Sequence, residues 1–314
     1  MTPLSIVTLT MNTALDVAAD ADEVVPTEKV RCRAVRYDAG GGGVNVARFA
    51  RVLGATVSAV FTAGGSTGSR VIDMVEAAGV PGVPVPIEGA TRESFTVNER
   101  ATGKQYRFVL PGPVLSPGEE ARCLEALRQA AYSAQFVVAS GSLPPGVPLD
   151  FYQRVADMCR EAGALLILDT SGGGLSHITS GVYLLKPSVR ELRECVGRPL
   201  PTEAEQLAAA HELIDRGIAR IVVVSLGAQG ALLAASSHSE RFPALPVAAV
   251  SGIGAGDAMV AGITVGLAEG WTLDRAVRYG IAAATAKLQT PATSVFDRAD
   301  VEHHFAEQLA PSGT

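Results

Sequence analysis

The sequence has few aromatic residues, few cysteines and no long run of apolar residues. Aromatic residues make up 5% of the 314 residues, whereas 47% are hydrophobic and 33 are glycine, so mainly aliphatic and small side chains must form the core. This composition favours an α/β protein with one large domain and an insertion, or with two modest domains. No segment approaches the ~18 consecutive apolar residues that a membrane-spanning helix needs, so no membrane partner is expected.

Signals for export and for disulfide or zinc chemistry are also missing. Met1–Leu4 has no basic residue, and the long apolar segment of a secretory leader is absent. The four cysteines are far apart and form no C-x-x-C pair; they are Cys32, Cys123, Cys159 and Cys195. This spacing predicts reduced, buried thiols and a cytoplasmic protein rather than a disulfide framework or a zinc site.

The chain is acidic overall but basic in two stretches. Its net charge of −6 argues against nucleic acid as the main partner. Residues 24–37 and 90–110 nevertheless hold eight basic and three acidic residues. Two compatible explanations stay open: these side chains could attract an anionic small molecule, or they could protect exposed strand edges from aggregation.

Hydrophobic periodicity predicts a parallel sheet with helices on both faces, because short apolar strands alternate with amphipathic helices along most of the chain. The expected strands are Ile6–Leu9, Val57–Phe61, Phe136–Ala139, Leu165–Asp169, Tyr183–Leu185 and Ile221–Ser225. The expected helices are Val44–Leu53, Arg70–Ala78, Glu119–Ala131, Asp150–Ala162, Val189–Val196, Glu203–Arg216, Asp257–Ala268, Leu273–Leu288 and Ala299–Leu309.

Two stretches break this alternation. Residues 13–37 and 91–110 alternate polar and apolar residues, as half-exposed strands do, and they carry most of the basic excess. We predict that they form a small β-sheet lid over the carboxyl ends of the main strands, where open α/β sheets bind ligands. The main domain would then comprise residues 1–12, 38–90 and 111–314. Exposed apolar positions in the lid predict a homodimer joined lid to lid.

The most informative motif is Gly254-Ala255-Gly256-Asp257, which precedes an apolar helix. Its small residues would let a phosphate contact the N–H groups at the helix start, with Asp257 beside it as a proton acceptor. On its own, an Asp after Gly at a helix start is more often only a cap. A second cluster, Gly40–Gly43, changes that balance, because four glycines cost backbone entropy and suggest a close approach to the main chain. Together the motifs indicate phosphoryl transfer between a donor and an acceptor.

Competing motifs are incomplete. Residues 64–70 are the stretch most similar to a P-loop but lack its lysine, and no glycine motif opens a helix directly after the first strand, as a dinucleotide site would. Ser140-Gly141-Ser142 does not match a hydrolase nucleophile elbow. Asp169-Thr170-Ser171 follows a strand and could be a site edge or a turn; on its own the turn is favoured.

Taken together, the two glycine motifs resemble the two signatures of the PfkB (ribokinase-like) carbohydrate kinases. Further matching stretches occur in collinear order over nearly the whole chain: Thr8–Asp16, Lys29–Cys32, Gly40–Arg48, Ala63–Gly68, Gln105–Phe108, Ser140–Val147, Ser225–Ala231 and Gly254–Met259. The resemblance implies an α/β fold, a ribokinase-like three-layer sandwich with a mainly parallel central sheet and a small β-sheet lid.

The implied activity is ATP- and Mg²⁺-dependent phosphorylation of fructose 6-phosphate to fructose 1,6-bisphosphate in glycolysis. Kinases of fructose 1-phosphate and tagatose 6-phosphate share these motifs, and a non-catalytic sugar-phosphate sensor with the same fold is a further alternative. A nucleoside kinase is less favoured, because the lid has few aromatic residues for stacking and many cations.

The resemblance also implies roles for single residues. Asp257 would be the general base, and the amides of Gly254, Ala255 and Gly256 would stabilise the transferred phosphoryl group. The sugar phosphate would be bound by Asp16, Lys29, Gly41, Gly42, Asn45, Arg92 and Ser140, with Arg92 and Lys29 on its phosphate. ATP would lie against Lys186, Ser188, Glu191, Ser225, Gly227 and Gly230, with Glu191 holding Mg²⁺ through water.

Two positions depart from the family pattern. The family usually has Asn where Ser188 stands, so the magnesium–phosphate network would be looser or bridged by an extra water. The family often shows Asn-x-Gly-Thr where this chain has Thr290-Pro291-Ala292-Thr293. That segment, with Ser251 and Ile253, often forms a potassium site from backbone carbonyls. K⁺ activation is therefore a further expectation, which Ala292 puts in question because it restricts the backbone.

Overall fold

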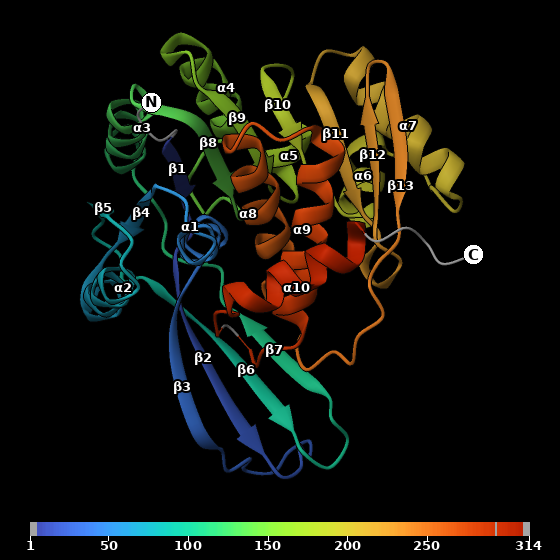
Figure 1. Ribbon diagram of the computed structural model, residues 1–314. Helices are drawn as coiled ribbons and strands as arrows, with labels where there is room; N and C mark the ends of the chain where they lie inside the picture. Colours follow the sequence, from blue (N-terminus) through green and yellow to red (C-terminus); the bar gives the residue numbers. More distant parts are fainter. Residues whose placement is uncertain (1–4, 293, 310–314) are drawn as a thin grey trace.

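The computed structural model, which describes residues 5–292 and 294–309, contains a nine-stranded sheet with helices on both faces (Figure 1). The strand order is β13-β12-β11-β10-β9-β8-β1-β4-β5, parallel from β11 to β5, with β12 and β13 antiparallel at one edge. The bounds are β1 Ser5–Thr10, β4 Val57–Ala63, β5 Gly82–Pro86, β8 Ala134–Ser140, β9 Leu165–Asp169, β10 Val182–Leu185, β11 Ala219–Ser225, β12 Ala231–Ala235 and β13 His238–Phe242. This architecture confirms the predicted fold class.

The helices form two layers, each built around its own buried apolar cluster. One layer contains α1 (Gly42–Val52), α2 (Gly65–Ala77), α8 (Ala255–Ala268), α9 (Leu273–Leu288) and α10 (Arg298–Leu309). The other contains α3 (Pro117–Ala131), α4 (Phe151–Ala162), α6 (Val189–Val196) and α7 (Glu203–Asp215); α5 (Gly173–Ser176) and the 3₁₀ turn η1 (Gly227–Gln229) are short. Every predicted helix and strand is present, whereas β5, β12 and β13 were not predicted. Two prolines in β5 conceal it, because proline is unusual inside strands.

A separate four-stranded sheet extends from the main body (Figure 1). It consists of β2 (Ala14–Ala21), β3 (Arg33–Gly40), β6 (Arg92–Glu99) and β7 (Gln105–Val109), in the order β3-β2-β6-β7. The register places four apolar side chains in one cross-strand row: Tyr37, Val17, Phe95 and Phe108. Because side chains alternate along a strand, Asp16, Arg92 and Arg107 lie on the opposite face. One face of this sheet is therefore largely apolar, and the other carries charges.

Within the described ranges, no helix combines the length and the apolar character needed to cross a membrane. Two parts of the sequence-based predictions fall outside the described residues. They are Met1–Leu4, considered above as a leader, and Thr293 in the expected potassium segment.

Candidate active site

The glycine cluster before α1 allows three chain segments to meet closely. A Cβ atom at Gly42 would lie 2.2 Å from the Ser140 Oγ, and one at Gly43 would lie 2.3 Å from the Leu9 carbonyl oxygen. Gly41 has a φ of 106°, which favours glycine. These glycines are therefore required for the start of α1 to pack against the carboxyl ends of β1 and β8.

Asp257, in the first turn of α8, points at the same place. Asn45 Nδ2 in α1 donates a hydrogen bond to Asp257 Oδ2 at 2.9 Å, and Ser140 Oγ donates to Oδ1 at 3.4 Å. The two sequence motifs thus converge around one carboxylate. Asn45 Oδ1 is buried and has no hydrogen-bond partner among the described residues, so it remains available to accept from a ligand hydroxyl.

The electrostatic environment makes Asp257 a poor acid and a good proton acceptor near neutral pH. Burial raises the pKa of Asp257 to about 7, and Asp169 adds to this shift, whereas the Asn45 hydrogen bond and Lys186 oppose it. Burial also raises the pKa of Asp16 to about 6, against the nearby Arg92 and Arg107. A carboxyl group whose pKa lies near the working pH is suited to general-base catalysis.

Lys186 forms an ion pair with Asp169 beside this carboxylate. Lys186 Nζ lies 3.1 Å from Asp169 Oδ1, and the two side chains are only 5% and 15% exposed. Burial lowers the pKa of Lys186, but Asp169, Glu191 and Asp257 together hold it above its ordinary value. A Cβ at Gly256 would lie 3.8 Å from Nζ, so the ammonium faces the start of α8. Asp169 thus lies beside the Asp257 carboxylate. The sequence alone favoured a simple turn at Asp169, whereas this ion pair favours the alternative, an edge of the site.

Ser188 and Glu191 are already engaged with each other at the start of α6. Ser188 caps the helix, and Glu191 Oε2 accepts from both the Ser188 amide and its Oγ at 2.8 Å. The Ser225 amide donates to the Pro187 carbonyl at 2.9 Å, so Ser225 lies beside this cap. Three of the expected nucleotide-binding residues therefore share one edge of the site.

The two glycines expected at the nucleotide differ in their surroundings. Gly227 has a φ of 61°, and no described atom lies within 4 Å of the position a Cβ would take. A Cβ at Gly230 would lie 2.1 Å from the Phe242 carbonyl oxygen. Packing of β12 against the end of β13 therefore suffices to explain Gly230, whereas Gly227 leaves open space.

Replacing Ser188 with alanine is expected to destabilise the fold by about 1 kcal/mol, because α6 loses its cap. Glu191 would also lose one of its two orienting hydrogen bonds, the one from the Ser188 hydroxyl, and the KM for Mg·ATP is expected to rise about tenfold, as when a residue orienting a metal-bound group is lost. Thr202→Ala is the matched control, since Thr202 and Glu205 form the same capping box on α7. Equal loss of melting temperature in both variants, with a change in KM only at position 188, is the expected result; an unchanged KM contradicts a nucleotide role.

Arg92 is held in place on the charged face of the small sheet. Its Nη1 donates to the Leu110 carbonyl at 3.0 Å, and its Nε and Nη2 donate to the Asn12 carbonyl at 3.3 and 3.2 Å. It borders a cavity of about 530 Å³ that Asn12 and Ser142 also line. Asp16 lies nearby over Gly40, where a Cβ would approach its Oδ2 to 2.2 Å. The sugar-binding residues predicted at Asp16 and Arg92 thus lie close together.

Lys29 is not brought to this group within one chain. It is exposed in the loop between β2 and β3, at the far tip of the small sheet (Figure 1). The cavity that it lines is formed by other residues of that loop, including Asp22, Glu23, Glu28 and Arg31. A role for Lys29 in binding the phosphate would require a second copy of the chain.

The loops expected to bind potassium already hold a lysine. Lys287 Nζ donates to the Ala292 carbonyl at 2.6 Å and to the Thr290 Oγ1 at 2.9 Å. Burial lowers the pKa of Lys287 to about 8, so the group remains mainly protonated at pH 7. Ser251 is buried, and its Oγ accepts from the Ile253 amide at 3.3 Å. The Ala292 carbonyl therefore already has a cationic partner, and this oxygen does not fit as a ligand of a free monovalent ion while the Lys287 ammonium occupies it.

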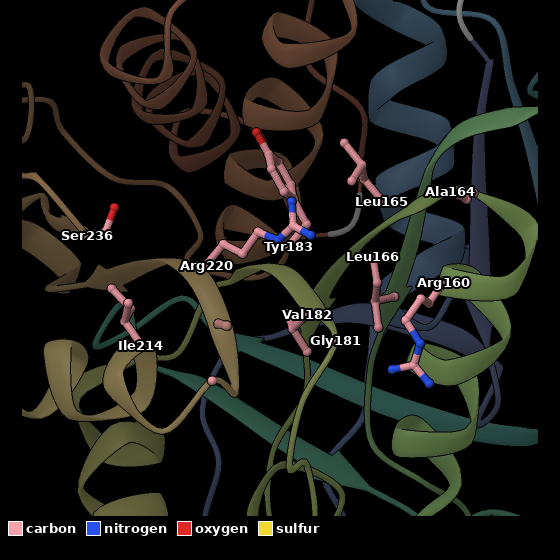
Figure 2. A pocket seen from close by; sticks show the side chains of 13 residues that line it. Arg160, Ala164, Leu165, Leu166, Gly181, Val182, Tyr183, Ile214, Arg220 and Ser236 are labelled. Atoms are coloured by element: carbon pink, nitrogen blue, oxygen red, sulfur yellow. The ribbon is translucent and has the colours of Figure 1, made fainter.

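A cavity of about 690 Å³ lies apart from this site. It is formed at the amino ends of β9, β10 and β11, whereas the candidate site lies at the carboxyl ends of the strands. Arg160, Tyr183 and Arg220 surround it (Figure 2).

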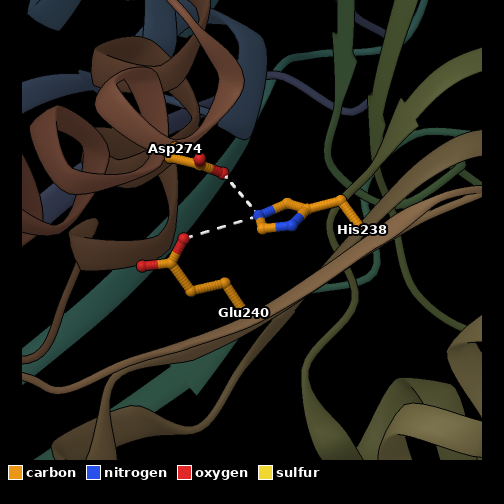
Figure 3. A group of neighbouring side chains, drawn as sticks. All are labelled: His238, Glu240 and Asp274. Atoms are coloured by element: carbon orange, nitrogen blue, oxygen red, sulfur yellow. Dashed lines mark hydrogen bonds and ion pairs between the residues drawn. The ribbon is translucent and has the colours of Figure 1, made fainter.

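A histidine between two carboxylates joins the edge strand β13 to α9. His238 Nε2 lies 2.9 Å from Asp274 Oδ1 and 3.5 Å from Glu240 Oε2 (Figure 3). Arg278 already pairs with Glu240 at 2.7 Å, so this half-exposed group is interpreted as an ion-pair network.

Comparisons with known proteins extend over nearly the whole chain. Residues 4–298 match the family model described as pfkB family carbohydrate kinase. The chain is 64% identical to the ATP-dependent 6-phosphofructokinase isozyme 2 of Mycobacterium tuberculosis, over 98% of this chain and 91% of the relative. It is 38% identical to the Escherichia coli protein of the same name, over 96% and 98% of the two chains. The crystal structure of phosphofructokinase-2 from E. coli in complex with potassium superposes with a TM-score of 0.93 at 36% identity, covering 97% of this chain and 99% of that one.

Proposed function

The chain belongs to the pfkB family of carbohydrate kinases, and from this premise we propose that it transfers the γ-phosphoryl group of ATP to fructose 6-phosphate, forming fructose 1,6-bisphosphate. The observation that carries the proposal is the buried Asp257 carboxylate, held by Asn45 and Ser140 at the start of α8. The resemblance to curated 6-phosphofructokinases supports the choice of sugar.

In the proposed reaction, Asp257 accepts the proton of the sugar hydroxyl as its oxygen attacks the γ-phosphorus. The bond from phosphorus to the β-phosphate oxygen breaks, and ADP leaves with that electron pair. The N–H groups of Gly254–Gly256 and the positive end of α8 stabilise the charge on the transferred group. Asp16 and Asn45 orient the sugar, with Gly41 and Gly42 beside it, and Arg92 binds its existing phosphate.

On the nucleotide side, Lys186, Ser188, Glu191, Ser225 and Gly227 would border ATP. Mg²⁺, when bound, would neutralise phosphate oxygens. Glu191 fits a role through metal-bound water, because its Oε2 is occupied by Ser188 while a carboxylate retains further acceptor capacity. The ion pair with Asp169 fixes the Lys186 ammonium toward the start of α8, where transferring phosphate oxygens would lie.

A turnover panel tests the substrate assignment. ATP consumption is measured with fructose 6-phosphate, fructose 1-phosphate, tagatose 6-phosphate and fructose, and the highest kcat/KM is expected for fructose 6-phosphate. Preference for either other sugar phosphate would replace the substrate while leaving the kinase assignment in place. No turnover with any of them would favour the non-catalytic sensor, for which the same compounds should still bind.

The pKa of Asp257 sets an expected pH profile. Because only the ionised carboxylate accepts a proton, kcat/KM is expected to rise with pH up to about 7 and to level off by about pH 8. Below pH 6 it should fall at least tenfold per pH unit, since Asp16, with a pKa of about 6, also becomes protonated. The profile is measured at saturating ATP between pH 5.5 and 9. A flat profile would contradict the general-base role.

We also propose that the small sheets join two copies of the chain, each acting as a lid over its own site. The row of Tyr37, Val17, Phe95 and Phe108 supports this, because Phe95 and Phe108 are 37% and 56% exposed, and burying such rings is favourable. Sedimentation equilibrium tests it: Phe108→Asp should shift a dimer toward monomer, whereas a wild-type monomer would exclude the interface.

A further inference from the structure

Lys287 is a fully buried cation that the proposed reaction does not use. Its side chain is 0% exposed, and it lies in the last turn of α9. The free energy of burying a lysine is unfavourable unless its ammonium is well hydrogen-bonded. Here the Ala292 carbonyl and the Thr290 hydroxyl, both in the loop after α9, accept from Nζ.

The ammonium lies next to the phosphate-binding end of α8. A Cβ at Gly254 would be 3.4 Å from Lys287 Cε, so the side chain runs past the first of the three residues, Gly254–Gly256, whose N–H groups form the proposed anion hole. The neighbouring Leu288 carbonyl accepts from the amides of Val250 and Ser251, at 2.7 and 3.1 Å. The Leu288 carbonyl therefore joins the loop before α8 to the end of α9, and the Lys287 side chain lies beside this junction.

Ala292 has an unusual backbone that the ammonium helps to explain. Its φ is 41°, a left-handed conformation that is unfavourable for alanine. In this conformation its carbonyl accepts the 2.6 Å hydrogen bond from Lys287. A backbone carbonyl and a hydroxyl oxygen are also the kinds of ligand that a monovalent metal ion takes, and an ammonium group satisfies them equally, because it is a compact charge with three donors.

We propose that Lys287 is a built-in monovalent cation: its ammonium takes the place of a potassium ion between these two loops and makes the protein independent of K⁺. The proposal rests on the proposed kinase function for its kinetic consequences, but not for its structural ones. It distinguishes this chain from the similar E. coli protein, whose structure was solved in complex with potassium. The tethered charge holds the loop before α8 in position and adds positive potential behind the anion hole.

The test compares wild type with two variants in KCl, NH₄Cl and tetramethylammonium chloride at equal ionic strength. For wild type, the melting temperature and kcat/KM are expected to be the same in all three salts, within 1 °C and twofold. Lys287→Ala removes the charge and leaves space, so kcat/KM should fall at least tenfold in tetramethylammonium, and the melting temperature should fall with it. Both should be partly restored by K⁺ or NH₄⁺.

Lys287→Met is the matched variant, because it fills the space without the charge; it should show the same losses and no rescue. Lys104→Ala is the control for removing a lysine, since Lys104 is exposed in the turn between β6 and β7.

Stabilisation or activation of wild type by K⁺ over tetramethylammonium would overturn the proposal, and so would a Lys287→Ala variant that matches wild type in every salt. If Lys287→Ala does not fold, the wild-type salt comparison still decides. The melting data stand without any turnover, so failure of the kinase assignment would be seen separately.

Discussion

Replacing Asp257 with asparagine is expected to lower kcat by ~10²–10⁴, the range found when a general base is lost. Asparagine has nearly the same shape but cannot accept the hydroxyl proton. The KM values for sugar phosphate and ATP should change little, because the variant keeps the anion hole and the substrate-binding residues. Steady-state kinetics measure both values, and Asp73→Asn is the control, since it makes the same chemical change at an exposed position of α2.

The same substitution has an opposite expected effect on stability. Burial raises the pKa of Asp257 from 3.8 to about 7, so the folded state holds its proton more tightly than the unfolded state does. The protonated Asp257 therefore contributes fully to the free energy of unfolding at low pH, and this contribution is lost as the pH rises from about 4 to about 7. We expect the free energy of unfolding of Asp257→Asn to exceed that of wild type by about 1–3 kcal/mol at pH 8, with a smaller gain at pH 5.

These two outcomes separate chemistry from misfolding. An inactive but stabilised variant supports the general-base role of Asp257, because burying its ionised carboxylate in the folded state is unfavourable. A variant with near-normal kcat would remove the general-base assignment. An inactive and destabilised variant would indicate that the carboxylate holds the fold together through Asn45 rather than accepting a proton.

The parts of the site that sequence could predict are those in which a local pattern carries the chemistry. The Gly40–Gly43 and Gly254–Asp257 motifs lie more than 200 residues apart, yet each shows by its small residues that something approaches the backbone. Their pairing followed from a family resemblance, and the bond between Asn45 and Asp257 agrees with it. The parallel sheet was predictable for the same reason, because its strands are short apolar runs.

Contacts between distant side chains could not be predicted in this way. Asp169 and Lys186 occupy the ends of neighbouring strands, and only the order of β9 and β10 in the sheet places them together. The signal available was the position of Asp169 at the carboxyl end of a parallel strand, where ligand sites gather. Lys287 offered no signal, since a lysine in the last turn of a helix normally reaches solvent.

Charge clustering in the sequence was a weaker guide than strand register. The two basic stretches suggested one anion-binding patch that included Lys29 and Arg92. The register instead places Arg92 and Arg107 on the same face as Asp16, whereas Lys29 lies in the distal loop. The position of a charged side chain in a loop depends on where the loop lies in the fold, and a local count of charges does not predict that.

Arg92→Ala is expected to raise the KM for fructose 6-phosphate by ~10–10² and to change kcat by less than tenfold. The expected size follows from losing one charge-assisted hydrogen bond to a phosphate, which contributes about 1.5–3 kcal/mol, because the other guanidinium N–H groups already donate to Asn12, Ser94 and Leu110. The guanidinium is already held by the Asn12 and Leu110 carbonyls, so little ordering is needed when the phosphate binds. Arg92→Lys should give an intermediate KM, because an ammonium keeps the charge but lacks the fixed planar arrangement of the guanidinium donors.

Arg100→Ala is the matched control, since Arg100 is exposed at the end of β6 and should leave both KM values unchanged. The decisive quantity is the ratio of kcat/KM for fructose 6-phosphate to that for fructose. Wild type should strongly favour the phosphorylated sugar, and Arg92→Ala should lose most of that preference while its KM for ATP stays the same. Equal use of fructose by wild type, or an equal loss of ATP binding in the variant, would mean that Arg92 does not bind the phosphate of the sugar.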